Sequence, residues 1–214
     1  MSTPKNRLRV AVLLSGQGTS LENLLEQIDA GNVDAEVVAV LSSKTGAYGL
    51  ERARKRGIPA LTVARRDYAD IDQFNDALHT ALAPHQVDLI ALLGFLSLFQ
   101  SRDLYTNRVL NVHPALIPAF SGQGFYGQRV YDAVLASGVK VTGATVHFTD
   151  DEYDHGPILL QEAVSVEAND TAETLAARVT AAERRLVPRA IQLIAQGRVE
   201  VENGRTRLAP AAVE

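Results

Sequence analysis

Residues 8–28 read LRVAVLLSGQGTSLENLLEQI, and this stretch decides the fold class. It begins with a mostly apolar run, Leu8 to Leu14, which has the length of one buried strand. The chain then passes through Ser15-Gly16-Gln17-Gly18 into a segment whose leucines and isoleucine recur at three, four and seven residues, the spacing of one helix face. A strand that turns through glycines directly into an amphipathic helix is typical of the start of a β–α–β unit.

The same alternation continues outward along the first half of the chain. Further apolar runs of strand length are separated by helix-like stretches, and several of these runs are apolar on both faces, as in a parallel sheet covered by helices. The strands are expected at 37–41, 60–63, 87–93 and 109–113, and the helices at 20–30, 49–56 and 71–82.

The second half has a different pattern. A turn-rich stretch, 114–127, is followed by a short helix, two long strands and a long helix that Asp170-Thr171-Ala172-Glu173 opens as a capping box. The short helix is expected at 130–136, the strands at 139–148 and 157–166, the long helix up to about Ala195, and a terminal hairpin at 199–207. These lengths and spacings predict one domain over residues 1–214, with a core of about 7–210. It is an α/β fold, a three-layer α/β/α domain with a mostly parallel, Rossmann-like sheet and a C-terminal antiparallel extension.

Composition excludes several classes of protein. The chain has no cysteine, which excludes a disulfide scaffold, a thiolate metal site and a cysteine nucleophile. Its formal net charge of −4 argues against binding to long nucleic acids, which favours basic surfaces. The longest apolar run, 89–99, is too short to cross a membrane, and the first nine residues are too polar for a signal peptide. We therefore expect a cytoplasmic protein.

The glycine turn after the first strand is the first candidate site. Its glycines allow close backbone approach, and the free N–H groups at the start of the following helix attract an anion, so a phosphate or carboxylate is the favoured ligand. The turn is not a P-loop, because no lysine follows the second glycine, and it lacks the third glycine of a dinucleotide fingerprint. The alternative is a plain glycine turn in which Thr19 or Ser20 caps the helix.

The second candidate is Asn111-Val112-His113-Pro114, at the end of the expected fifth strand. Residues two apart on a strand point to the same side, so Asn111 and His113 project together. The carboxyl ends of strands in open α/β sheets are where ligands bind. A structural hydrogen-bonding histidine is the alternative interpretation at this position.

The third candidate is the acidic segment Thr149 to Pro157 (TDDEYDHGP). One of its acids is expected to reach back to His113, orient the ring and raise its pKa. A solvated hairpin loop is the alternative. The spacing does not match an EF-hand, and alternating strand faces make a metal site formed by His147, Asp154 and His155 improbable.

Five motifs in this order resemble the folate-dependent formyltransferase family. They are LLSGQGTSLENLL, LLGFLSLF, NVHPALIPAF, TGATVHFTDDEYDHGPILLQ and AAERRLVPRAI, and together they extend from about Arg7 to Pro210. The NVHP element followed at this separation by DEYDHGP is a highly specific pair. Relatives that carry an additional domain are longer than this chain.

The resemblance implies an activity and a set of site residues. A formyl group would pass from N10 of 10-formyltetrahydrofolate, the one-carbon donor, to the glycine amine of phosphoribosylglycinamide in purine (IMP) biosynthesis, without a metal. Asn111 and His113 would stabilise the oxyanion of the tetrahedral intermediate, His113 would donate a proton, and Asp154 would keep His113 charged. His147 would be an additional active-site residue.

The same resemblance implies the substrate-binding residues. Gly18, Thr19 and Ser20 would hold the ribonucleotide phosphate, and Glu183 would hold its ribose end. The remaining contacts would be made with the folate, by residues of the LLGFLSLF motif, the acidic loop and the strand that precedes it. These folate-binding residues are Leu96, Ser97, Leu98, Phe99, Asn111, Asp150, Asp151, Glu152, Tyr153 and Asp154.

The chain departs from the family pattern in places. Many relatives carry an arginine where this chain has Ser97, and the usual histidine-bearing segment PGLHTHR is replaced by SGQGFYGQR at 121–129. The glycines of that segment suggest a backbone-lined flap against the substrate rather than a catalytic loop. Alternative functions are hydrolysis of formyltetrahydrofolate, transfer to another amine such as an amino sugar nucleotide, and a non-catalytic folate- or nucleotide-binding module. No nucleic acid or membrane partner is expected, and a homodimer is left open.

Overall fold

The computed structural model describes residues 7–210. The chain forms two compact units, and α5 (Ala172–Ala195) contributes residues to both. The first unit runs to Phe99 and takes in Ile191–Arg198, and the second comprises Gln100–Ala190 and the residues from Val199 onward. The sequence predicted a single domain, and that remains a prediction.

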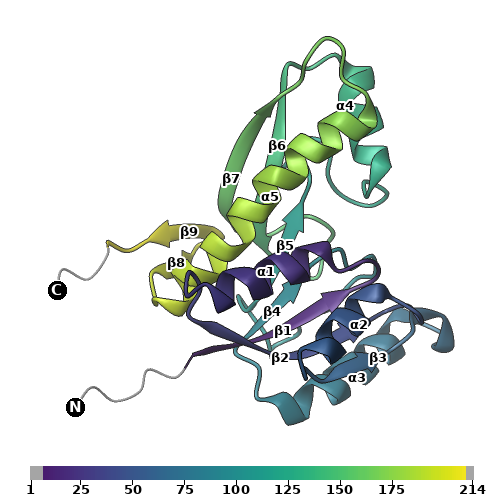
Figure 1. Ribbon diagram of the computed structural model, residues 1–214, viewed down its shortest axis with the longest axis vertical. Helices are drawn as coiled ribbons and strands as arrows, with labels where there is room; N and C mark the ends of the chain where they lie inside the picture. The colour runs from purple at the N-terminus through teal and green to yellow at the C-terminus, as the bar shows by residue number, and fades with distance from the viewer. Residues whose placement is uncertain (1–6, 211–214) are drawn as a thin grey trace. The chain divides into compact units, whose positions relative to one another are not determined.

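The first unit contains four strands in the order β3-β2-β1-β4, and all the pairings between them are parallel. The strands are β1 (Leu8–Leu14), β2 (Ala35–Ser42), β3 (Ala60–Thr62) and β4 (Leu89–Leu92). The connecting α-helices are α1 (Thr19–Asp29), α2 (Tyr48–Lys55) and α3 (Ile71–Leu82), with short 3-10 turns η1 (Arg65–Asp67) and η2 (Ala83–His85) (Figure 1).

This strand order determines which helices share a face of the sheet. The connections through α1 and α2 both step toward β3, whereas the connection through α3 returns across the sheet to β4. Because β–α–β crossovers are right-handed, α1 and α2 cover one face and α3 covers the other. The central strands are accordingly buried on both sides: residues 10–14 of β1 are fully buried, and so is Phe74 of α3. The expected α/β/α layering is confirmed in this unit.

The second unit contains β5 (Val109–His113), β6 (Val141–Phe148) and β7 (Ile158–Ser165), paired antiparallel in that order. Helix α4 (Gln128–Ser137) lies between β5 and β6 in the chain. A separate two-stranded sheet, β8 (Val199–Glu202) with β9 (Arg205–Leu208), turns through Asn203-Gly204, both with positive φ. The predicted antiparallel extension and terminal hairpin are confirmed.

Helix α5 begins one residue later than the predicted capping box implies. The capping residue is Thr171: its Oγ1 accepts from the backbone N–H of Thr174 (3.3 Å), and Thr174 Oγ1 accepts from the backbone N–H of Thr171 (2.9 Å). Asp170 instead forms an ion pair with Arg178 (2.8 Å). The reciprocal pattern of a capping box is present, displaced by one position.

Among the described residues, no helix is long and apolar enough to cross a membrane.

Candidate active site

The register of β5 against β6 builds the centre of the candidate site in the second unit. Asn111 lies directly opposite His147, and His113 lies opposite Thr145. Because side chains alternate along strands, these four residues share one face of the sheet. Asn111 and His113 therefore project together as the sequence predicted, and the partner strand adds His147 beside them.

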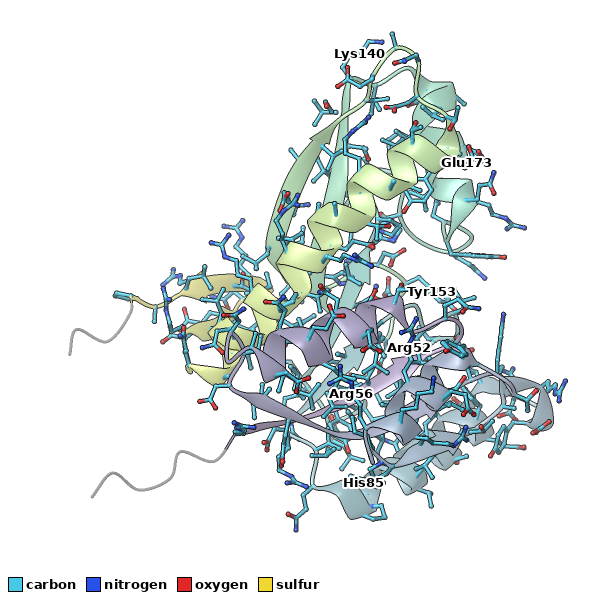
Figure 2. All side chains as sticks on the ribbon, viewed as in Figure 1. Arg52, Arg56, His85, Lys140, Tyr153 and Glu173 are labelled. Atoms are coloured by element: carbon cyan, nitrogen blue, oxygen red, sulfur yellow. The ribbon has the colours of Figure 1, made fainter. Side chains whose placement is uncertain are left out.

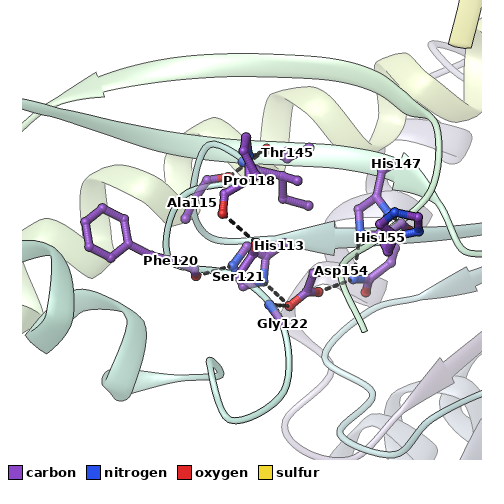
Figure 3. Close-up of polar contacts among 12 residues, drawn as sticks. His113, Ala115, Pro118, Phe120, Ser121, Gly122, Thr145, His147, Asp154 and His155 are labelled. Atoms are coloured by element: carbon purple, nitrogen blue, oxygen red, sulfur yellow. Dashed lines mark hydrogen bonds and ion pairs between the residues drawn. The ribbon is translucent and has the colours of Figure 1, made fainter. Parts of the chain in front are cut away.

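Asp154 completes this cluster from the acidic loop. Its Oδ2 lies 3.3 Å from His113 Nδ1 and accepts a 2.9 Å hydrogen bond from the backbone N–H of Gly122 (Figure 3). Its Oδ1 accepts from Asn111 Nδ2 at 3.3 Å. The side chains of His113 and Asp154 are only 4 % and 10 % exposed. The acidic-loop residue that contacts His113 is thus Asp154, the one that the family resemblance implies.

The two ring nitrogens of His113 both face acceptors. Nδ1 faces the Asp154 carboxylate, and Nε2 donates to the backbone carbonyl of Phe120 at 2.8 Å (Figure 3). Both acceptors can be served at once only when each ring nitrogen carries a proton. Burial by itself would raise the pKa of Asp154, but the hydrogen bond and charge of His113 outweigh it, and the pKa lies below its ordinary value.

His147 is fully buried and is held by backbone carbonyls. Its Nδ1 donates to the carbonyl of Phe148 (2.9 Å) and lies 3.1 Å from that of His155, and its Nε2 faces Asn111 Nδ2 at 3.1 Å. Burial lowers the pKa of His147, and the nearby carbonyls and Asp154 offset this only in part. The ring is therefore neutral near pH 7.

Two further acids of the acidic loop, Asp150 and Asp151, also have partners. Asp151 accepts from both the backbone N–H and the hydroxyl of Ser101 (2.9 Å for the hydroxyl), and the exposed ring of His155 pairs with Asp150. The ion pair with Asp150 raises the pKa of His155.

Within residues 7–210, no group of three or more His, Asp or Glu side chains is placed to hold a metal ion.

Glu183, on α5, lies within electrostatic reach of the cluster. Burial raises its pKa to about 7, and the charge of His113 lowers it in part. Glu183 also acts on Tyr131 of α4, whose buried phenol has a raised pKa for the same primary reason, desolvation. A carboxyl group whose pKa lies near 7 and which interacts electrostatically with a histidine is found at functional sites more often than on the solvated surface.

The glycine turn lies in the first unit. Gly18 is the N-cap of α1 with a left-handed φ of +70°, and no side chain caps the helix, so capping by Thr19 or Ser20 is not what the structure adopts. A Cβ on Gly18 would lie 2.6 Å from the Cα of Gly49, so only glycine fits there. Arg52, labelled in Figure 2, donates to the carbonyl of Gln17 (3.0 Å) and pairs with Glu22. The N–H groups at the start of α1 are therefore left without a side-chain cap.

The predicted folate segment lies beside this turn within the same unit. Ser15 Oγ accepts from the backbone N–H of Leu96 (3.0 Å), and the backbone N–H of Ser15 donates to Gly94 (3.0 Å). Leu96 is about half exposed, whereas the ring of Phe99 is buried, 5.2 Å from that of His79. Contacts of Phe99 with a ligand would therefore involve its backbone.

The structure thus groups the predicted residues into two clusters, each within one unit. Asn111, His113, His147 and Asp154 converge in the second unit, with Glu183 nearby, and the glycine turn and Leu96 converge in the first. Sequence reasoning missed the backbone groups of Phe120 and Gly122 that contact the His113–Asp154 pair. Phe120 and Gly122 both have a positive φ, +52° and +93°. The glycine-rich composition of 121–129 was the one feature of the sequence that pointed to an unusual backbone here.

Comparison with known proteins identifies the family. The family model described as formyl transferase matches residues 8–191. Phosphoribosylglycinamide formyltransferase of Arabidopsis thaliana, named as chloroplastic, is 39 % identical over 197 residues, covering 91 % of this chain and 68 % of that protein. Trifunctional purine biosynthetic protein adenosine-3 of Gallus gallus is 41 % identical over 92 % of this chain, which spans about a fifth (19 %) of its length.

Solved structures agree with these matches. The crystal structure of glycinamide ribonucleotide transformylase 1 from Symbiobacterium toebii has a TM-score of 0.91 and 40 % identity, and each chain covers 98 % of the other. The α/β fold class expected from the sequence is thereby confirmed for the chain. The chain belongs to the formyl transferase family.

Proposed function

We propose that the protein transfers the formyl group of 10-formyltetrahydrofolate to the glycine amine of phosphoribosylglycinamide, a step of purine biosynthesis. The observation that carries this proposal is the Asn111–His113–Asp154 cluster, in which an amide and an imidazole that has acceptors at both nitrogens each lie 3.3 Å from one largely buried carboxylate. The names of the relatives supply the acceptor and the pathway.

The reaction requires stabilisation of negative charge and a proton transfer. The glycine amine attacks the formyl carbon, and the formyl oxygen becomes an oxyanion. N–H donors of Asn111 and His113 stabilise this oxyanion. The bond between the formyl carbon and N10 then breaks, N10 gains a proton and the attacking nitrogen loses one. A His113 imidazolium, held by Asp154, donates that proton and recovers one from the amine directly or through water.

His113 must release one of its present contacts in order to donate to the substrate. Its Nδ1 is held by the carboxylate, and its Nε2 is bound to the carbonyl of Phe120, a residue that belongs to a turn with positive φ. The carbonyl contact is the shorter of the two, at 2.8 Å against 3.3 Å, but the carbonyl is neutral, whereas the carboxylate also holds a protonated ring by charge. The proton that leaves for the reaction is therefore the one on Nε2, and the 120–122 turn must shift when substrate binds.

The other predicted residues take binding roles in this proposal. The uncapped N–H groups of Gly18, Thr19 and Ser20 bind the phosphate, as helix N-termini do, and Glu183 accepts hydrogen bonds from the ribose hydroxyls. Leu96–Phe99 and Asp150–Asp154 bind the folate, with the exposed side chain of Leu96 against its rings and backbone groups on its polar edge. A cytoplasmic location and a homodimer remain predictions.

An acceptor-dependence assay tests the proposal. Tetrahydrofolate formation is followed by absorbance with 10-formyltetrahydrofolate alone, with phosphoribosylglycinamide added, and with an amino sugar nucleotide added. We expect product only when phosphoribosylglycinamide is present. Product formed without an amine would indicate hydrolysis, and product formed only with the amino sugar nucleotide would assign a different acceptor. Either result would overturn the proposal.

A further inference from the structure

His147 contacts the candidate oxyanion donor, and its protonation state follows from its partners. The groups around Nδ1 are the backbone carbonyls of Phe148 and His155, at 2.9 and 3.1 Å, and a carbonyl only accepts. Nδ1 therefore carries the proton. The ring is buried and faces one other titratable base, His113, and one carboxylate, Asp154. In the neutral ring Nε2 is then unprotonated, and its lone pair can only accept a hydrogen bond.

This lone pair determines the orientation of the Asn111 amide. The amide group that faces Nε2 at 3.1 Å must be a donor, so it is Nδ2 and not Oδ1. The second neighbour of the same nitrogen is Asp154 Oδ1, at 3.3 Å, which also only accepts. With the amide turned over, Oδ1 would face two acceptors at once. Both contacts therefore favour the same orientation of the amide. His147 contributes the uncharged acceptor and Asp154 the charged one.

The two contacts of Asn111 Nδ2 are not equally strong. The 3.1 Å contact with His147 lies within the ordinary range for a hydrogen bond, whereas the 3.3 Å contact with Asp154 lies just beyond it. The two hydrogens of an amide nitrogen lie in one plane about 120° apart, so anchoring one of them fixes the direction of the other. The hydrogen directed at Asp154 is the one available to a developing oxyanion.

We propose that His147 is a positioning residue, which as the neutral Nδ1-protonated tautomer anchors one amide hydrogen of Asn111 and thereby aims the other at the formyl oxygen. The inference rests on the proposed function for its second half. Its first half, the tautomer and the amide orientation, concerns the protein without substrate. The two halves are therefore tested by separate measurements.

The tautomer is measured by nitrogen NMR on full-length protein labelled with ¹⁵N at histidine. The resonances of His147 are assigned by their loss in His147→Gln. We expect a pyrrole-like shift for Nδ1 and a pyridine-like shift for Nε2 at pH 7 to 8. A protonated Nε2 would overturn the proposal whatever the enzyme's activity, since a donor at that position cannot accept from Asn111. Failure of the proposed function leaves this measurement valid.

The positioning role is tested by a pair of variants with and without an acceptor. In His147→Gln the side-chain carbonyl can accept from Asn111, so we expect kcat to stay within about tenfold of wild type. In His147→Leu no acceptor remains, and we expect kcat to fall at least about a hundredfold with little change in either KM. His85→Gln, in η2 of the first unit, is the matched control for the substitution itself.

Two kinetic outcomes would contradict the positioning role. The first is a His147→Leu enzyme that folds, as judged by its unfolding temperature and circular dichroism, and keeps kcat within threefold of wild type. The second is equal loss of kcat in the Gln and Leu variants at matched unfolding temperature, which would mean that the side chain acts only through packing. If His147→Leu does not fold, the Gln variant and the NMR measurement still decide the proposal.

Discussion

Replacing Asp154 by asparagine removes the charge beside His113 while preserving the shape of the side chain. The carboxylate oxygen lies 3.3 Å from His113 Nδ1, and two unit charges at that distance attract by about 5 kcal/mol at an effective dielectric constant of 20. The amide dipole retains part of this, and the side chain is 10 % exposed, so we take a loss of about 3 to 4 kcal/mol. At about 1.4 kcal/mol per decade, kcat should fall roughly a hundredfold to a thousandfold.

The assay is the steady-state rate of tetrahydrofolate formation at saturating concentrations of both substrates. Asp103→Asn, an exposed position of the same unit, is the control and should retain the wild-type rate. Thermal unfolding shows whether the Asp154→Asn protein is folded. A folded Asp154→Asn enzyme with kcat within threefold of wild type would refute the role given to this charge.

The same substitution also has a pH-dependent effect on stability. The folded-state pKa of Asp154 is lowered, so the carboxylate stabilises the fold above its unfolded pKa of about 3.9, and this contribution is lost as the pH falls through the folded value. The free energy of unfolding of Asp154→Asn should therefore lie below that of wild type at pH 7, and the difference should narrow below about pH 4. Denaturant titrations at both pH values check this, and a difference that is constant with pH would contradict it.

Three further predictions concern other parts of the site. The pKa of Glu183 rises to about 7 on folding, so the ionised, buried carboxylate destabilises the fold at higher pH. Glu183→Gln should therefore raise the free energy of unfolding, measured by urea titration, by up to about 3 kcal/mol at pH 8. Near pH 4, where the carboxyl is protonated in the folded protein, the substitution should leave the free energy of unfolding unchanged. Gly122 has φ +93° and donates to Asp154, so Gly122→Ala should strain the turn and lower kcat about tenfold or more in the steady-state assay, and an unchanged kcat would count against this contact. Bulky residues at Thr19 and Ser20 should raise the KM for phosphoribosylglycinamide more than that for the folate; the opposite ordering would misplace the phosphate site.

Local sequence patterns were sufficient to predict the regular elements. The helix expected at 71–82 is α3, and the strand expected at 109–113 is β5, because apolar spacing and a closing proline or glycine define such segments without help from the rest of the chain. The start of α5 was displaced by one residue. Asp170 and Thr171 are both suitable capping residues for this helix. Asp170 is engaged in an ion pair with Arg178, and Thr171 caps the helix together with Thr174.

The site could be predicted only in part. That Asn111 and His113 face the same side follows from strand geometry, but the choice of Asp154 among four acids required the family resemblance. The contact of His147 with Asn111 depends on the β5–β6 register, which no local pattern specifies. The contributions of Phe120 and Gly122 come from backbone atoms, and residue identity says little about where a backbone carbonyl or N–H points.

Transfer of a labelled formyl group tests the central claim most directly. With 10-[¹³C]formyltetrahydrofolate and phosphoribosylglycinamide, wild-type protein should place the label on the glycine nitrogen, detectable by mass spectrometry of the ribonucleotide and by the ¹³C resonance of the new formamide. Asp154→Asn should do so at least about a hundredfold more slowly. Release of the label as free formate by the wild-type protein, with the ribonucleotide unlabelled, would contradict the account.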